Sequence, residues 1–69
     1  MRDFSEILRE LRKERGLTQK ALAEALSMTE RVIRYYESKS HRPDLDVLIK
    51  IARYFDVSLD YLAGLKDER

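Results

Sequence analysis

Apolar residues recur at helical spacing along most of the chain, and no stretch sustains the strict alternation of a β-strand. The first stripe consists of Phe4, Ile7, Leu8 and Leu11. Stripes of this kind predict helices over residues 4–15, 19–26, 30–37, 45–55 and 59–62. We therefore expect an all-α fold, in which five helices form one compact domain over residues 1–65, followed by a charged tail at 66–69 that frays.

Short polar residues precede each of these helices, where a hydroxyl or carboxylate can accept a hydrogen bond from a free N–H group of the first turn. The expected caps are Asp3, Thr18, Thr29, Asp44 and Ser58. Glu6 would complete a capping box with Asp3. Gly16 suits the left-handed position after the first helix, and Gly64 ends the last one.

The stretch from Gln19 to Ser38 predicts two short helices joined by a tight turn. Leu22 and Leu26 share one face of the first, and Ile33 and Tyr36 share one face of the second. Two helices of about two turns each bury too little apolar surface to be stable alone. The flanking helices must therefore hold them in place.

The second half of the chain supplies that support. We expect the apolar stripe of the 45–55 helix to face the core, and we expect the 59–62 helix to bury two leucines, Leu59 and Leu62. The stripe consists of Leu45, Leu48, Ile49, Ala52 and Phe55, with Ile51 beside it.

Charge is unevenly distributed in a chain whose net charge is only +1. Residues 1–43 hold ten Lys or Arg against seven Asp or Glu, whereas residues 44–69 hold four against six. Within residues 31–42, four basic residues face a single acid, Glu37. Such a local basic patch favours a polyanionic partner, although a solvated charged surface would show the same pattern.

Several function classes lack the residues they need. The chain has no cysteine, which excludes a disulfide scaffold, a thiolate zinc site and a cysteine nucleophile. The only histidine, His41, has no catalytic partner placed by the sequence. No apolar run approaches the roughly 20 residues of a membrane span. We expect a cytoplasmic protein that is not an enzyme and uses no metal or cofactor.

Nucleic-acid binding has the residues it needs. A helix presented by a tight turn can enter the DNA major groove, where arginine pairs with guanine and glutamate accepts from cytosine. The polar face of the 30–37 helix carries Glu30, Arg31, Arg34 and Tyr35. Gln19 begins the preceding helix, whose free N–H groups favour a phosphate. Further phosphate contacts are expected from Lys20, Lys39 and Arg42.

Each of these residues also has a simpler interpretation. Arg31 could be merely solvated, and Tyr35 could rest on the 45–55 helix. Glu30 could serve only to complement the dipole of its own helix.

Three strings identify a resemblance that covers nearly the whole chain: LRKERGLTQKALAEAL, MTERVIRYYE and PDLDVLIKIARYFDVSLDYLAG. They resemble the lambda-repressor-like helix-turn-helix of lambdoid phage repressors, the Cro/C1-type or XRE family. The resemblance implies that Gln19 braces a phosphate and that Arg34 lies along the outer side of the recognition helix. It implies base-facing and backbone-facing roles for Thr29, Glu30, Arg31 and Tyr35. It also implies a buried, structural ion pair between Arg12 and Glu37.

Two departures from the family pattern concern turns. The family usually has glycine where this chain has Ser27, and a glycine follows the residue that corresponds to Glu37. We therefore expect Ser27, and Lys39 in the later loop, to adopt left-handed backbone conformations that glycine would adopt at lower cost.

The resemblance favours a sequence-specific transcriptional regulator, a repressor that binds a pseudo-palindromic operator as a homodimer. Surplus apolar residues near the last helix suggest Tyr54, Tyr61 and Leu65 for the dimer surface. Two alternatives remain open. The chain could be an antitoxin-type module that binds a small protein partner and represses its own operon, or it could be the DNA-binding half of a longer repressor.

Overall fold

The computed structural model describes residues 2–69, and this range contains five helices and no strand. The helices are α1 (Phe4–Glu14), α2 (Gln19–Ala25), α3 (Glu30–Glu37), α4 (Leu45–Phe55) and α5 (Leu59–Leu62). The all-α prediction is confirmed, and every helix boundary lies within one residue of its predicted position. Within the same range, no helix has both the length and the apolar character needed to cross a membrane.

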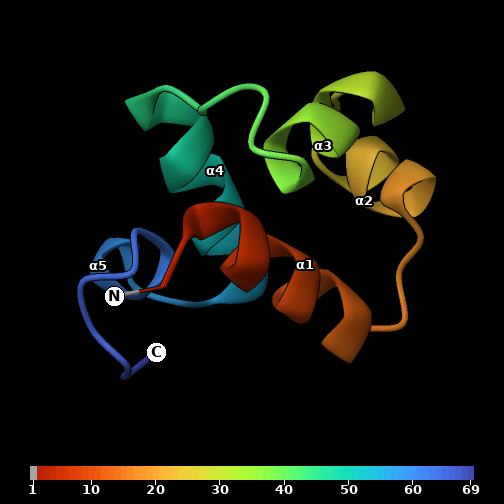
Figure 1. The fold of residues 1–69 in the computed structure, drawn as a ribbon. Coiled ribbons are helices and arrows are strands. Elements are labelled where there is room, and N and C mark those ends of the chain that lie inside the picture. Colours follow the sequence, from red (N-terminus) through yellow and green to blue (C-terminus); the bar gives the residue numbers. More distant parts are fainter. Residues whose placement is uncertain (1) are drawn as a thin grey trace.

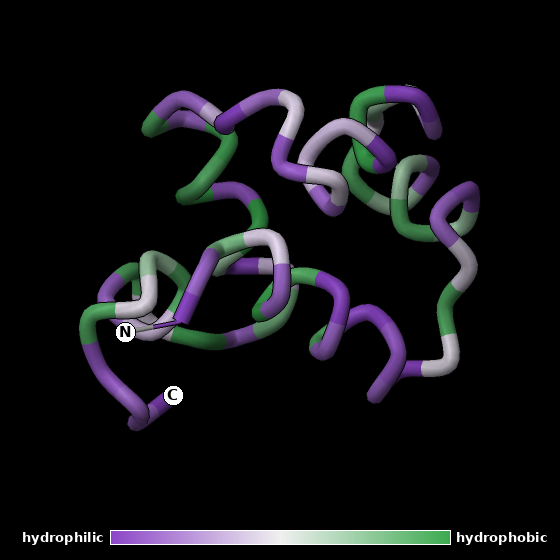
Figure 2. The backbone as a smooth tube through the Cα atoms, viewed as in Figure 1, coloured by the Kyte–Doolittle hydropathy of each residue, from purple (hydrophilic) through white to green (hydrophobic). Residues whose placement is uncertain are grey.

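Helix α1 occupies the centre of the molecule, where it contacts α3 on one side and α5 on the other (Figure 1). Helix α2 packs on α3, and α4 packs on α5. Apolar and polar residues alternate along the helices, whereas the loop between α3 and α4 is mainly polar (Figure 2). The two halves of the domain are therefore joined through α1.

All five helices contribute to a single hydrophobic core. Its fully buried large side chains are Ile7, Leu8, Leu22, Leu26, Ile33, Ile51 and Leu62. Ile33 lies in the middle of α3 and is completely inaccessible to solvent. Because α3 is only two turns long, this one side chain fixes which face of the helix points outward.

Four of the five predicted caps are formed. The side chains of Thr18, Thr29, Asp44 and Ser58 each accept a hydrogen bond from the backbone N–H three residues later, at 2.9 to 3.2 Å. The capping prediction for Asp3 is wrong, because its side chain accepts no hydrogen bond from the first turn of α1. The Asp3 carboxylate instead lies 2.6 Å from the Lys39 ammonium group.

Within residues 2–69, three residues other than glycine have left-handed backbone conformations. Two of them, Ser27 (φ 56°) and Lys39 (φ 67°), were expected, and Asp56 (φ 56°) after α4 was not. A side chain in this region costs roughly 1–2 kcal/mol. The α2–α3 turn offsets this cost through a hydrogen bond of 2.8 Å from the Met28 N–H to the Ala23 carbonyl.

Gly64 holds the N-terminal segment against the end of α5. A Cβ atom at this position would lie 2.0 Å from the backbone oxygen of Arg2, closer than any non-bonded contact allows. The φ angle of 83° also favours glycine. The absence of a side chain is therefore required here for two independent reasons.

Two leucines that were expected in the core lie at the surface. Leu45 is 63% exposed and Leu59 is 40% exposed. Both are the first residue of their helix, and Figure 1 shows the first turn of α4 at the periphery of the molecule. Ile51 fills the core from the middle of α4 instead, and Leu62 does so from α5.

The C-terminal tail does not fray as expected but lies against α1 and α5. The Arg69 carbonyl accepts a hydrogen bond from the Ser58 N–H at 2.8 Å. The Arg69 guanidinium lies over the Tyr61 ring, 5.3 Å from its centroid, and donates to the Glu14 carboxylate. This hydrogen bond lowers the pKa of Glu14.

A buried carboxylate ties the helix-turn-helix to α1. Glu37, the last residue of α3, is 4% exposed. Arg12 donates to both of its carboxylate oxygens, from Nε at 2.7 Å and from Nη2 at 3.0 Å. The third donor of the same guanidinium, Nη1, reaches the carbonyl of Leu17 in the α1–α2 turn at 2.8 Å.

Two further side chains complete this Glu37 network. Gln19 Nε2, at the start of α2, donates to Glu37 Oε1 at 3.2 Å. Arg9 Nη2 donates to the backbone carbonyl of Glu37 at 2.8 Å. Helices α1 and α2 therefore both contact the end of α3, and the Glu37 carboxylate is paired although it is buried.

We predict that Ile33→Ala lowers the free energy of unfolding by about 2–5 kcal/mol, because it removes buried apolar atoms and leaves a cavity. Ile33→Val, which removes one methylene group, should cost only about 0.5–1.5 kcal/mol. Urea denaturation would measure both. Equal effects of the two variants would show that Ile33 does not fill the core.

We predict that Glu37→Ala lowers the free energy of unfolding by about 3–5 kcal/mol, because it leaves the Arg12 guanidinium buried without its partner. The double variant Arg12→Met, Glu37→Leu should lose less than the single variant, since no buried charge then remains at this pair. Denaturation of the single and double variants forms the test. A double variant that loses as much unfolding free energy as Glu37→Ala, or more, would contradict the assigned pairing.

Candidate nucleic-acid interface

The outward face of α3 carries charged and polar side chains at the surface. Its buried face consists of Ile33, Tyr36 and Glu37, so the opposite face of the helix points away from the core. Glu30, Arg31 and Arg34 are exposed, and Tyr35 is half-buried. These are the residues that the sequence predicted for the base-reading face, and the structure brings all four together on one helix.

Two contacts organise this face. The Arg34 guanidinium lies 3.9 Å from the Glu30 carboxylate, one helical turn away. Arg31 Nε donates a hydrogen bond of 3.0 Å to the Tyr35 hydroxyl. Thr29, just before the helix, uses its hydroxyl as the cap. The Thr29 side chain is therefore already engaged within the domain.

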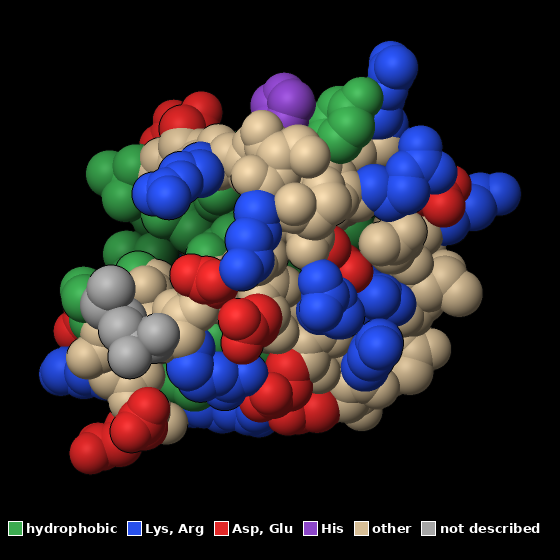
Figure 3. All heavy atoms as spheres, in the orientation of Figure 1, with side chains coloured by type: hydrophobic (Ala, Val, Ile, Leu, Met, Phe, Trp, Pro, Cys, Tyr) green, Lys and Arg blue, Asp and Glu red, His purple; other side chains and the backbone are tan. Residues whose placement is uncertain are grey.

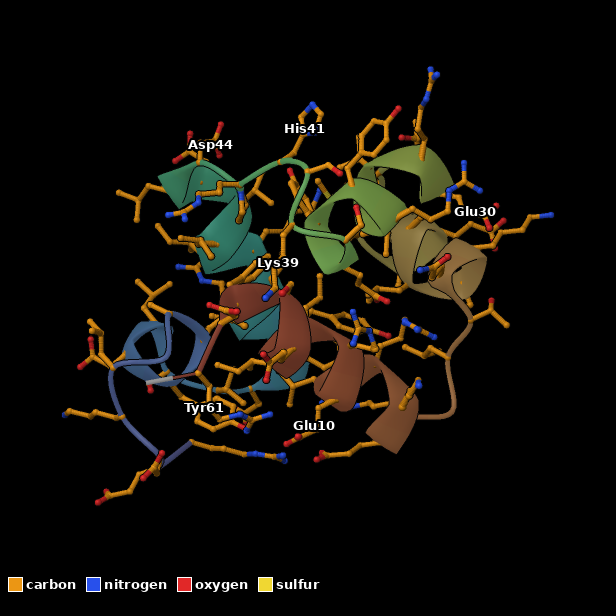
Figure 4. All side chains as sticks on the ribbon, in the orientation of Figure 1. Glu10, Glu30, Lys39, His41, Asp44 and Tyr61 are labelled. Atoms are coloured by element: carbon orange, nitrogen blue, oxygen red, sulfur yellow. The ribbon has the colours of Figure 1, made fainter. Side chains whose placement is uncertain are left out.

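His41 extends this face into the α3–α4 loop. Its ring stacks on the Tyr35 ring with a centroid separation of 4.6 Å and an interplanar angle of 11°. Figure 4 shows His41 at the outer edge of the molecule, pointing away from the core. Nothing in the sequence indicated this contact, because the two residues belong to different elements and follow no helical spacing.

The other predicted phosphate contacts differ in their surroundings. Lys20 and Arg42 are exposed. Within residues 2–69, neither forms an ion pair shorter than 4.0 Å. The side chain of Gln19 is held by Glu37 in the network described above. Both basic side chains are therefore available to a partner, whereas Gln19 is a bridge within the domain.

Lys39 pairs with an acidic residue of the domain, although its side chain is 62% exposed. Figure 4 shows its side chain directed toward α1, where it pairs with Asp3. The hydrogen bond from Lys39 lowers the pKa of Asp3, and the same bond raises the pKa of Lys39. Its left-handed backbone explains the direction, because the chain reverses at this residue. Lys39 therefore forms a solvent-exposed pair between the α3–α4 loop and the residue just before α1.

Sequence reasoning missed Arg9, whose side chain extends from α1 and contacts the end of α3. Arg9 lies three residues before Arg12, so both side chains project from the same side of α1. This spacing was a usable signal. Arg9 reaches the last carbonyl of α3, a position where a cation also interacts favourably with the helix dipole.

Basic side chains gather on the side of the molecule formed by α2 and α3, with the histidine at the same edge (Figure 3). The lower part of the same view mixes acidic with basic side chains. The described residues contain no group of three His, Cys, Asp or Glu side chains arranged to hold a metal ion. The surface formed by α2 and α3 therefore carries mainly basic side chains, with the Glu30 carboxylate among them.

The three residues expected at a dimer surface have different environments. Leu65 is 65% exposed. Tyr54 is half-buried, and the Arg15 guanidinium lies 5.4 Å from its ring centroid. Tyr61 is only 4% exposed, because it packs in the core beneath Arg69. The expectation for Tyr61 is therefore wrong, since its ring has no free surface to offer a second copy.

A family model described as helix-turn-helix matches residues 8–62 of the chain. Among curated proteins, the chain is 42% identical to the HTH-type transcriptional regulator YobD of Bacillus subtilis over 65 residues, which is 94% of this chain and 58% of that protein. It is 43% identical to the HTH-type transcriptional regulator ImmR of the same organism, covering 88% of this chain and 47% of that one. The chain therefore spans about half the length of these relatives.

Solved structures show the same architecture. A transcriptional regulator from Listeria innocua aligns with a TM-score of 0.85 and 40% identity, covering 97% of this chain and 63% of that one. The P22 c2 repressor in complex with a synthetic operator aligns with a TM-score of 0.86 over 96% of this chain and the whole of that one, at 23% identity. The match at 23% identity supports the fold alone.

The match of the family model over most of the chain and the arrangement of its five helices agree with the family resemblance of the three sequence strings. The chain belongs to the helix-turn-helix family of the Cro/C1 type, also called the XRE family.

Proposed function

We propose that this domain binds double-stranded DNA sequence-specifically and regulates transcription, as a repressor, by inserting α3 into the major groove. The observation that carries the proposal is the orientation of α3. Its apolar face is locked by Ile33 in the core, and its far end is locked by Glu37. The opposite face is therefore held outward as a rigid reading surface. The sequence similarity to transcriptional regulators supports the same function.

On this surface, Arg31 and Glu30 are the proposed base-reading residues. A guanidinium can donate two hydrogen bonds to guanine O6 and N7, and a carboxylate can accept from cytosine N4. Arg34, farther along the helix, and Tyr35, near the loop, would contact the adjacent backbone or bases. A helix in the groove contacts base edges mainly with its N-terminal residues, and Glu30 and Arg31 are the first two residues of α3.

The phosphate contacts follow from the available charges. Lys20 and Arg42 flank α3 on either side along the chain and are unpaired within the described residues, so both are proposed to bind phosphate. Lys39 is joined to Asp3 in an exposed pair, which stabilises the fold little and can exchange partners. The Thr29 hydroxyl accepts its capping hydrogen bond and can still donate, and Gln19 Nε2 has a second N–H, so both residues are proposed to contact the DNA backbone.

A second copy of the domain would complete the site. The symmetry of a pseudo-palindromic operator matches a homodimer, with half-sites about one helical turn apart, roughly 10–10.5 base pairs. Leu65 and Tyr54, which lie on the α4–α5 side of the domain, are the proposed dimer contacts. That side is apolar at its edge in Figure 3, and it is distinct from the basic side formed by α2 and α3.

We predict that Arg31→Ala loses about 1–3 kcal/mol of discrimination at one base pair of the preferred site. Selection of bound duplexes from a random pool would define that site, and titrations at several salt concentrations would measure the affinity. The wild-type domain should bind more weakly as salt increases, because bound phosphates release counterions. Arg31→Ala should change the unfolding free energy by no more than about 0.5 kcal/mol.

Arg53→Ala is the matched control, since it removes an exposed arginine from α4 without touching α3. It should preserve the base preference. An affinity that does not depend on salt, or equal affinity for selected and random duplexes, would refute the proposed function.

We predict that Leu65→Asp weakens self-association at least tenfold, because burial of a leucine contributes about 1.5–3 kcal/mol and a buried carboxylate is unfavourable. Sedimentation equilibrium, with and without operator DNA, would measure the dimer. Leu45→Asp is the matched control, since Leu45 is 63% exposed and Leu65 is 65% exposed. If Leu45→Asp has the larger effect, the dimer surface lies at the start of α4 instead.

A further inference from the structure

We propose that His41 is a positioning residue for DNA reading: it holds the Tyr35 ring, and Tyr35 in turn orients the guanidinium of Arg31. The inference rests on the proposed function, because it assigns a determinant of base preference to the same surface. It concerns a loop residue that would not itself need to touch a base.

The contact between the two rings is well defined. With a centroid separation of 4.6 Å and an interplanar angle of 11°, the imidazole of His41 lies nearly parallel to the phenol of Tyr35. Such stacked pairs are favourable beyond the area they bury. His41 is exposed and Tyr35 is half-buried, so the imidazole covers one side of a ring that solvent would otherwise reach.

The loop backbone brings His41 to this position. Three donors converge on the carbonyl oxygen of Tyr35: Ser40 N at 3.0 Å, Ser38 Oγ at 3.2 Å and His41 N at 3.4 Å. The left-handed conformation of Lys39 reverses the chain between them. The loop therefore closes back on Tyr35, and the side chain of His41 follows its backbone onto the ring.

The far end of Tyr35 connects to Arg31. The Tyr35 hydroxyl accepts the hydrogen bond from Arg31 Nε at 3.0 Å, and the guanidinium carbon lies 5.8 Å from the ring centroid. Because Nε is the donor used, Nη1 and Nη2 remain available for a partner. Two parallel N–H donors are what recognition of guanine O6 and N7 requires.

An Arg31 guanidinium that is already oriented before DNA binds would favour the correct base over the wrong one. A free arginine loses rotamer freedom when it binds, and a guanidinium held in one orientation loses less. A fixed guanidinium also adapts poorly to another base, which leaves its donors unpaired. Removal of His41 should therefore reduce discrimination rather than general affinity.

The primary test is His41→Ala, measured by titration with the selected site, with a site changed at the base pair read by Arg31, and with random duplex. The preference between the first two should fall about three- to tenfold, the factor that corresponds to one aromatic pair. Affinity for random duplex should remain within twofold. The unfolding free energy should fall by no more than the free-energy equivalent of the factor expected for the preference, because the stack also stabilises the folded domain.

Two substitutions separate stacking from charge. His41→Phe keeps an aromatic ring and should restore the preference, whereas His41→Lys keeps a basic group and should not. Recovery by lysine alone, or an equal loss of affinity for every duplex in His41→Ala, would overturn the proposal and identify His41 as a phosphate contact.

The proposed effect of His41 on Arg31 through Tyr35, called the relay below, has its own test. Tyr35→Phe removes only the hydroxyl, so it should reduce the preference as His41→Ala does, with the stack intact. In an Arg31→Ala background, His41→Ala should have no further effect on discrimination. An independent effect of His41→Ala in that background would overturn the relay.

NMR of the free protein tests whether His41 orients the Arg31 guanidinium, even if the domain does not bind DNA. The Arg31 Nε–H resonance should move toward that of a solvated arginine in His41→Ala and remain near its wild-type position in His41→Phe. An unchanged resonance in His41→Ala would overturn the proposal. Failure of the wild-type domain to prefer any duplex would instead refute the proposed function, with the NMR result unaffected.

Discussion

The buried carboxylate of Glu37 is the constraint on which the rest of the structure depends. An ionised group in the interior is unfavourable unless its hydrogen-bonding capacity is satisfied. Here that requirement brings Arg12 from α1 and Gln19 from α2 to the end of α3. Hydrophobic packing alone would tolerate small rotations of a two-turn helix. Directional hydrogen bonds at its end remove that freedom.

The different roles of the residues on α3 follow from this arrangement. Burial of Ile33 determines which face of α3 lies in the core, and the hydrogen bonds of Glu37 fix the position of the helix along its axis. The exposed residues of α3 are not needed for packing and can therefore contact a partner. Basic residues then take different roles according to their partners. Arg12 and Arg9 bind Glu37 at the end of α3, and Lys39 forms an exposed pair with Asp3. Arg31 lies at the surface of α3. Residue type alone does not distinguish these roles, because all four are cations on adjacent segments.

The sequence predicted the fold well because helical spacing, capping residues and family motifs all indicated the same five elements. It predicted burial poorly at helix starts: Leu45 fits the stripe by spacing, yet α4 begins beyond the reach of its neighbours. Contacts between elements far apart in sequence were also inaccessible. The pairing of Lys39 with Asp3 and the stacking of His41 on Tyr35 depend on loop geometry that no periodicity encodes.

The left-handed turns at Ser27, Lys39 and Asp56 have a consequence for the balance between the folded and the unfolded domain. Each lowers the stability of a small domain, and typical domains have only about 5–15 kcal/mol in total. Proteases degrade the unfolded fraction, and any partner that binds only the folded form decreases that fraction. Backbone strain in these turns therefore increases the unfolded fraction of the free domain, and a partner that binds only the folded form decreases it again.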